Sequence, residues 1–181
     1  PHPMNPPPGP QDAVADSAAT TRRFGARREA LISAASRLYN ERGVIGTTLA
    51  EVAASVGLIK NSITYYFRRK EDLTVACFNR TIRVYDELIL RSGAQGPVAD
   101  RVVELLRLQV TLQGDIAQGR HPPVVGFHEI RALPSPHVEA VFASYTAMFR
   151  NLRQLLQGAE TAHWPRAHLN ARAHLLISCA L

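Results

Sequence analysis

The spacing of apolar residues along the chain predicts helices almost throughout. Between residues 31 and 39 they recur at intervals of three and four, which places them on one face of a helix running from about 25 to 43. Thr48 and Glu51 have the spacing of a capping box in front of a second, short helix that Gly57 closes. Further helices are expected at about 70–91, 98–117, 123–132, 136–158 and from 165 onward.

One stretch departs from this pattern. Residues 63–67, ITYYF, are β-branched or aromatic and favour a strand by propensity. A single strand of this length without a partner is not stable, so we expect this stretch to be part of a short helix as well. The sequence therefore predicts an all-α fold.

The positive charge of the chain is concentrated near its N-terminus. The 181 residues carry a net charge of +6, and residues 22–81 hold 11 basic and 5 acidic side chains, which accounts for the whole excess. An ordinary solvated face explains such an excess, and so does a module that binds nucleic acid or another anionic surface.

Three regions are expected. The Pro-rich residues 1–21 read as a disordered arm, with Met4 as the natural start. Residues 22–69 hold the excess positive charge and form a first helical region, and residues 70–181 form a second, longer helical region. The last helix is still apolar at Leu181, so we expect the native chain to continue.

Residues 48–67 have the features of a helix-turn-helix. Ala53 lets two helices approach closely, Gly57 permits a positive φ at the turn, and Ile63 anchors the second helix in the core. Ile59, Ile63 and Phe67 recur every four residues and are expected to face inward. The outer face and its flanks then carry amides, hydroxyls, phenols and cations, namely Lys60, Asn61, Ser62, Thr64, Tyr65, Tyr66 and Arg68.

These outward groups are of the kinds that hydrogen-bond base edges and phosphates in a major groove. Lys70 lies at the start of the next helix, where a phosphate also meets free backbone N–H groups. A capped helical hairpin with a polar outer face is the alternative. The acid-free face and its basic surroundings favour DNA binding.

The segment TTLAEVAASVGLIKNSITYYFRRKEDL, residues 47–73, resembles the DNA-binding signature of the TetR family of bacterial repressors. The resemblance extends from about Arg28 to Leu73. It implies a DNA-binding domain at residues 22–69 and a helical ligand-binding and dimerisation domain at residues 70–181. It also implies a homodimer that binds a palindromic double-stranded operator and is released by a small molecule bound in the second domain. It also implies that the chain is a transcriptional regulator rather than an enzyme.

The same resemblance implies roles for individual residues. Thr47 and Thr48 would contact phosphate, and Thr48 would cap the second helix. Lys60, Asn61, Ser62 and Thr64 would lie at the groove, and Tyr65, Tyr66 and Lys70 would hold the DNA backbone. Ile59 replaces the usual hydroxyl residue that caps the recognition helix, so Asn61 or Ser62 is expected to cap it one turn later. Thr64 stands where the family usually has a Tyr, and we expect Tyr65 to make the phosphate contact of that residue.

The resemblance further implies an effector pocket in the second half of the chain. Polar or aromatic side chains in otherwise apolar stretches are the candidates, and core or interface positions are the alternative for each. Such a pocket suits a mostly apolar ligand with one polar or acidic group. The candidate lining residues are Gln109, Phe127, His128, Arg131, Tyr145, Met148, Phe149 and Trp164.

Other classes of site are disfavoured. His163, His168, His174 and Cys179 do not share one helix face, so no metal site or other cofactor is expected. Two cysteines are too few for a disulfide framework, and with no long apolar run or signal peptide we expect a cytoplasmic protein without membrane contact. A helical protein–protein adaptor with a basic module is the main alternative function, and an enzyme is a distant one. The stripe on 136–158 and the last helix are expected to form a four-helix dimer interface.

Overall fold

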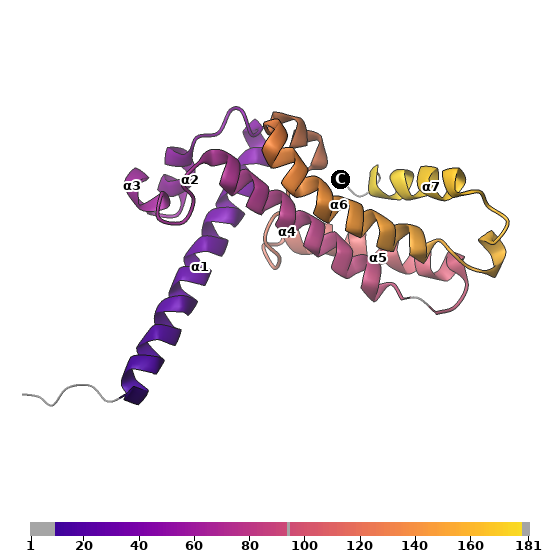
Figure 1. Cartoon of the computed structure of the whole chain (residues 1–181), viewed down its shortest axis with the longest axis horizontal. Helices are drawn as coiled ribbons and strands as arrows, with labels where there is room; N and C mark the ends of the chain where they lie inside the picture. Colours follow the sequence, from indigo (N-terminus) through magenta and orange to yellow (C-terminus); the bar gives the residue numbers. More distant parts are fainter. Residues whose placement is uncertain (1–9, 94, 179–181) are drawn as a thin grey trace, which may run out of the picture.

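The computed structural model describes residues 10–93 and 95–178, with side chains from Ala19 onward, and contains no strand among them. The expected all-α fold is thereby confirmed (Figure 1). The elements are α1 (Pro10–Arg42), α2 (Leu49–Ser55), α3 (Lys60–Ile63), α4 (Lys70–Arg91), α5 (Val98–Ala117), the 3₁₀ helix η1 (Phe127–Ala132), α6 (Ser135–Leu155), the 3₁₀ turn η2 (Ala159–Thr161) and α7 (Arg166–Ser178).

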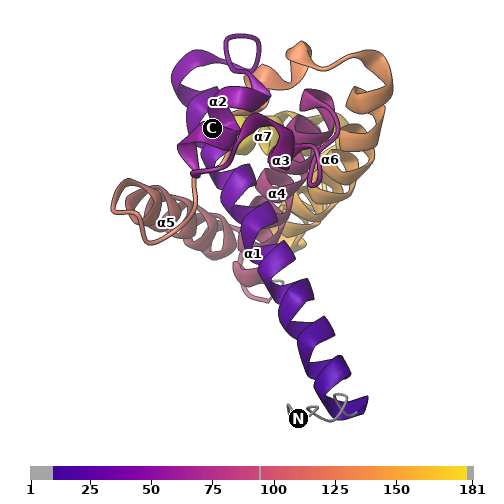
Figure 2. The same cartoon turned by 90° about the vertical axis from the view of Figure 1, so that its left-hand side faces the viewer.

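Helix α1 begins much earlier than the apolar pattern predicts. It starts at Pro10, so residues 10–21 are helical and do not form the loose arm expected there, while residues 1–9 lie outside the described residues. The reason is local: no Gly or Pro interrupts residues 11–24, alanines are frequent, and Pro is well suited to a first helical position. The first half of α1 projects beyond the other helices (Figures 1 and 2).

The second half of α1 enters the core through the predicted apolar stripe. Leu31 and Ala35 are fully buried there, and Tyr39 Oη lies 3.0 Å from Thr74 Oγ1 of α4. Gly43 follows the helix with φ 77°, a conformation that favours glycine, as expected for the residue that ends it.

Helix α4 is the central element of the helices that follow the first 69 residues. Helix α6 packs along it and contributes the side chains of Val141, Met148 and Leu152, all buried (Figure 1). Much of the stripe on α6 is therefore covered within the chain, whereas Phe142 is 59% exposed, and its expected role in a dimer interface stays a prediction. An apolar stripe predicts that a face is buried but does not say which neighbour buries it.

A buried arginine joins α1, α4 and the loop after α5. The guanidinium of Arg80 donates to the hydroxyls of Ser33 and Ser36 at 2.8 and 2.9 Å and also to the carbonyl oxygen of Pro123. Burial lowers the pKa of Arg80, and Glu29 lies 3.8 Å from its guanidinium. Val125 N donates to Thr81 Oγ1 at 2.9 Å in the same loop. The two halves of the chain thus share a polar core contact.

The helix expected at 123–132 is shorter than predicted. Residues 122–126 are not helical, and only the 3₁₀ helix η1 follows, because two prolines and buried Val124 and Val125 hold the preceding chain extended. The predicted continuation of the last helix beyond Ser178 lies outside the described residues. No helix in the described part of the chain is long and apolar enough to span a bilayer.

Candidate nucleic-acid interface and effector cavity

Helices α2 and α3 form the expected helix-turn-helix. Ala53 is fully buried where the helices approach, and Ile63 and Phe67 are buried beneath α3. Gly57 lies at the turn with φ 70°, which a residue with a Cβ adopts only with strain. The apolar anchors therefore hold α3 with its polar side outward.

Thr48 and Glu51 form the predicted capping box at the start of α2. Glu51 N donates to Thr48 Oγ1 at 3.3 Å, and Thr48 N donates to Glu51 Oε2 at 2.8 Å. Hydrogen bonds from the Thr48 side chain and backbone lower the pKa of Glu51. Its charge is therefore retained at the surface beside the helix start.

Thr47 lies elsewhere than predicted. Its side chain is 1% exposed, and its hydroxyl donates to the carbonyl oxygens of Gly43 and Leu38 at 3.0 and 3.4 Å. A hydroxyl buried in this way is not available to a phosphate, so the predicted phosphate contact of the Thr47 side chain is wrong. Thr47 instead fastens the loop between α1 and α2.

The N-terminus of α3 also differs from prediction. Ile59 is 73% exposed rather than inward, because Leu58 packs against the core one residue earlier. Ile59 occupies the N-cap without a side-chain hydrogen bond, as its apolar side chain requires. Asn61 and Ser62 lie inside the helix, so neither is the cap that was expected.

Most of the predicted DNA-contacting side chains reach the surface on or beside α3. Residues 59–70 contain no acidic side chain, and Thr64 Oγ1 donates to Asn61 O at 2.7 Å. Lys70 Nζ donates to Ile45 O at 3.3 Å, which holds this ammonium near the α1–α2 loop. Thr48, Lys60, Asn61, Thr64 and Tyr65 are exposed, while Ser62, Tyr66 and Lys70 are half-buried.

An aromatic cluster joins α1 to the turn after α3, and sequence reasoning missed its α1 member. The ring of Phe24 lies 5.4 Å from Tyr65 in an edge contact and 5.0 Å from Tyr66 in a stacked one. Tyr66 also packs against the core. One turn along α1, the Arg28 guanidinium lies 4.9 Å over the ring of Phe67. Phe24 precedes the helix start that the apolar pattern predicts, which is why no signal marked it.

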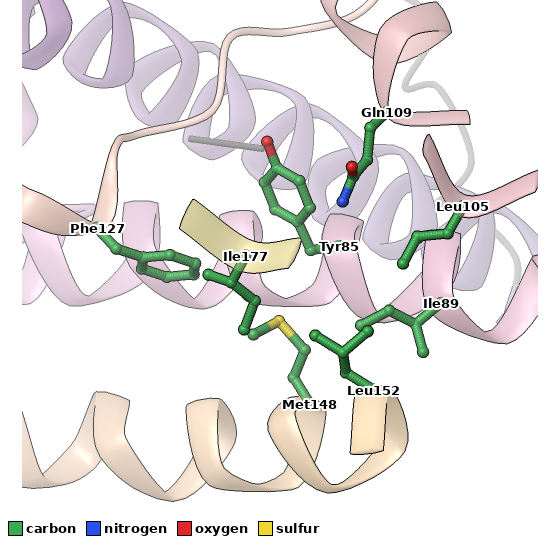
Figure 3. Close-up of a pocket in the computed structure, with 8 residues that line it drawn as sticks. All are labelled: Tyr85, Ile89, Leu105, Gln109, Phe127, Met148, Leu152 and Ile177. Carbon is green, nitrogen blue, oxygen red and sulfur yellow. The ribbon is translucent and has the colours of Figure 1, made fainter. Parts of the chain in front are cut away.

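The second half contains a small inner cavity of about 10 Å³, room for roughly one water molecule. Figure 3 shows Tyr85 and Gln109 on one side of it and Met148 on the other. Burial raises the pKa of Tyr85 to about 12, and Gln113 Nε2 donates to its hydroxyl at 3.4 Å. Of the candidates, the cavity includes Gln109, Phe127 and Met148, together with Tyr85, Ile89, Leu105, Leu152 and Ile177, which were not predicted.

A larger outer groove of about 560 Å³ lies between η1 and α6. Its lining joins aromatic rings to two basic side chains and includes four candidates, Phe127, His128, Arg131 and Tyr145, with Ile130, Val138 and Phe142. Phe127 borders both spaces, and its ring lies 5.4 Å from Tyr145 and 6.4 Å from Phe78. The groove has the size of a small-molecule site, whereas the inner cavity does not.

Two candidates line neither space. Phe149 lies 4.5 Å from the ring of His174, and Trp164 lies beneath the Arg172 guanidinium at 3.9 Å. Both side chains help to fasten α7, which is the alternative that the sequence left open. Within the described residues, no group of three or more His, Cys, Asp or Glu side chains is arranged to hold a metal ion, and Cys179 lies outside them.

Comparisons with known proteins point to one family. A family model for bacterial regulatory proteins of the tetR family matches residues 31–77. The HTH-type transcriptional regulator RutR of Escherichia coli K12 is 26% identical over 108 residues, which are 60% of this chain and 51% of that protein. The chain thus spans about half the length of the curated relatives it matches.

Solved structures share the fold over most of the chain. A tetR-family protein from Rhodococcus RHA1 matches with a TM-score of 0.68 at 19% identity, covering 84% of this chain and 80% of that one. AibR, solved in complex with isovaleryl coenzyme A and operator DNA, matches with a TM-score of 0.66 at 20% identity. The match covers 85% of this chain and 83% of AibR. Residues 31–77 thus belong to the TetR family of bacterial regulatory proteins, and the fold agrees with that family over most of the chain.

Proposed function

We propose that the chain is a ligand-responsive transcriptional regulator, acting as a repressor on a palindromic operator. The observation that carries this proposal is the acid-free outer side of α3, where Lys60, Asn61 and Thr64 are exposed. Residues 22–69 would form the DNA-binding domain, and residues 70–181 the ligand-binding and dimerisation domain. RutR, a transcriptional regulator, supports the proposal, which assigns no enzymatic reaction to the chain.

In this proposal, some residues on and around α3 contact bases and others contact phosphates. Lys60 would bind a guanine, with Asn61, Ser62 and Thr64 beside it in the major groove. Thr48, Tyr65, Tyr66 and Lys70 would hold phosphates. A single short helix reads too few base pairs for specificity, so the proposal includes a homodimer that places two copies about one helical turn apart. Light scattering on the purified chain measures the oligomeric state.

The double variant Lys60→Ala/Asn61→Ala tests the DNA-binding proposal. We expect wild-type protein to select a palindromic sequence from a pool of random duplexes, and the variant to lose measurable binding to that sequence in a mobility-shift assay. Circular dichroism should remain unchanged, because both side chains are exposed. Arg166→Ala/Gln157→Ala, which removes an exposed cation and an exposed amide from the second half, serves as the matched control.

Two outcomes would contradict the proposal. One is failure of the wild-type protein to enrich any sequence. The other is normal binding by Lys60→Ala/Asn61→Ala, which would exclude α3 as the recognition helix. An adaptor that binds other proteins would also show little dependence on salt, whereas operator binding should weaken steeply as salt rises.

The effector would bind in the outer groove between η1 and α6. The Phe127, Phe142 and Tyr145 side chains supply an aromatic surface, and Arg131 forms no ion pair within the described part of the chain. This chemistry favours an aryl or acyl group that carries an acid, whose anionic head would pair with the guanidinium. The isovaleryl coenzyme A bound by AibR, a thioester, gives a precedent for an acyl group in the same fold.

Thermal denaturation with a panel of aryl and acyl carboxylates and their neutral amides tests the effector site. We expect some carboxylates to raise the Tm and release the selected duplex, and their amides to do neither. Arg131→Gln should remove this discrimination, while Arg150→Gln, an exposed control on α6, should keep it. Equal responses of Arg131→Gln and wild-type protein would exclude the assigned role of Arg131.

A further inference from the structure

A second group of cations lies on α1, outside the helix-turn-helix. Arg23 and Arg27 are four residues apart, so they lie on one side of the helix, and both are exposed. Neither forms an ion pair within the described part of the chain. Glu29, the only acid between residues 19 and 30, lies 3.8 Å from Arg80 instead. Nothing in the fold accounts for these two charges.

This part of α1 is attached directly to the end of the recognition helix. Phe24 follows Arg23 and contacts Tyr65 and Tyr66, both proposed to hold the DNA backbone. The two tyrosine rings also lie 5.2 Å from each other, which closes a three-ring cluster. The cluster therefore determines where the arginine pair lies relative to α3.

The basic part of α1 lies where the helix passes the turn after α3, and the helix then continues away from the protein body. Figure 2 shows α1 passing α3 and continuing beyond the other helices. At about 1.5 Å per residue, the fourteen or so residues before Phe24 extend for roughly 21 Å. A duplex bound by α3 in the proposed way would present phosphates to this side of α1.

We propose that Arg23 and Arg27 bind phosphates of the operator duplex beyond the base pairs that α3 reads, and so extend the DNA contact outward. The inference rests on the proposed function. These phosphate contacts would not depend on base sequence. They would contribute to the affinity and register of the complex, while α3 supplies specificity.

Two observations favour DNA over other anionic partners. A helix that binds a lipid surface needs an exposed apolar face opposite its charges. Between residues 19 and 30, Phe24 is the only large apolar side chain, and the tyrosines cover it. The basic residues also continue the excess charge of the helix-turn-helix, as expected of one electrostatic footprint.

The variant Arg23→Gln/Arg27→Gln tests the inference by its salt dependence. Each phosphate contact contributes about 0.9 to the slope of log K against log[salt], so the variant should lower that slope by about two per protomer. At about 0.1 M salt we expect binding of the selected duplex to weaken by roughly tenfold or more, with the selected sequence unchanged. Both side chains are exposed, so the fold and the Tm should not change.

Two further variants separate the local contact from net charge. Arg83→Gln/Arg166→Gln removes the same charge from exposed positions on α4 and α7 and should bind as wild-type protein does. Arg23→Lys/Arg27→Lys keeps the charge and should restore most of the slope, because lysine also binds phosphate as a point charge.

A pair of duplexes then locates the contact. Both carry the selected core; one ends at its edges, and the other continues for about ten base pairs on each side, roughly one helical turn. Wild-type protein should prefer the longer duplex, and Arg23→Gln/Arg27→Gln should lose most of that preference.

An unchanged salt slope, or an equal loss in Arg83→Gln/Arg166→Gln, would overturn the inference and leave the proposed function intact. Binding of the wild-type chain to phosphatidylglycerol vesicles that depends on Arg23 and Arg27, with DNA binding unaltered in the variant, would overturn it in favour of a membrane partner. Failure of wild-type protein to select any duplex would instead overturn the proposed function itself.

Discussion

Thr47 and Thr48 are adjacent and chemically identical, yet they have different environments. Thr47 is buried, and its hydroxyl is bonded to the carbonyl oxygen of Gly43, whereas Thr48 is exposed and caps α2. The capping role of Thr48 was predictable because it depends on a residue three positions away. The burial of Thr47 was not, since it depends on where the chain after α1 folds back.

Ile59 is the residue at which local chemistry is least favourable. It occupies the N-cap of α3 without offering an acceptor, and it is largely exposed, so little packing offsets the loss. The Ser62 N–H already donates to the carbonyl oxygen of Ile59 at 2.9 Å, so the hydroxyl in Ile59→Ser would serve the N–H of Asn61, at the second position of the helix. We expect stabilisation of about 0.5–1 kcal/mol, seen as slower amide hydrogen exchange in residues 60–64.

Ile59→Ala is the control for that experiment, because it shortens the side chain without supplying an acceptor. It should leave exchange in α3 unchanged. Equal protection in the serine and alanine variants would mean that exposure of Ile59, rather than the empty cap, limits the stability of α3.

At the scale of elements, the spacing of apolar residues predicted correctly which helices exist and where they begin and end, wherever a helix packs along its length. The bounds of α4 and α5 agree with those expected at 70–91 and 98–117. The period cannot predict a helical segment whose sequence lacks an apolar stripe. The first half of α1 has no apolar stripe to mark it, and its helical state follows from composition alone.

The recognition element shows the reverse case. Its composition favours a strand, and only four residues, Lys60 to Ile63, are regular α-helix before the chain turns. Burial of Ile63 and Phe67 holds it in place, and the Phe24 cluster supports its far end. Tertiary packing therefore overrides propensity here, as it must for so short a helix.

At the scale of the whole molecule, η1 connects the outer groove to the helix-turn-helix. Glu129 Oε2 accepts a hydrogen bond of 2.7 Å from Val44 N, just after α1. Asn40 Nδ2 donates to Val124 O at 2.7 Å in the adjoining loop. Because Phe127, His128 and Arg131 of the groove lie on the same short helix, a ligand that moves η1 would act directly on the end of α1.

Glu129→Ala tests this connection. The variant leaves the buried Val44 amide without its acceptor, so we expect a loss of about 1–2 kcal/mol in the free energy of unfolding, measured by urea denaturation. An effector should still bind to the variant but release the duplex less completely. Glu139→Ala, an exposed carboxylate on α6, is the control and should behave as wild-type protein.

Unchanged stability in Glu129→Ala would show that the link does not hold the two halves together. Release as complete as in wild-type protein would mean that the effector acts through α4 alone.

The sequence alone could mark the candidate effector residues, but only the tertiary structure shows which of them line a cavity or groove. Gln109, Phe127 and Met148 line the inner cavity, and His128, Arg131 and Tyr145 the outer groove, but Phe149 and Trp164 pack against α7. An unusual side chain in an apolar stretch marks a position of interest. Whether it faces a space or a neighbouring helix depends on elements distant in sequence.

By itself the sequence determined the helical fold, the helix-turn-helix and its capping box, because each depends on residues within a few positions of one another. Only the tertiary structure decided that α6 is covered by α4, that Thr47 is buried, and that Phe24 holds α1 against the end of α3. These features arise where segments distant along the chain meet. Periodicity specifies which face of a helix is buried, and packing selects what buries it.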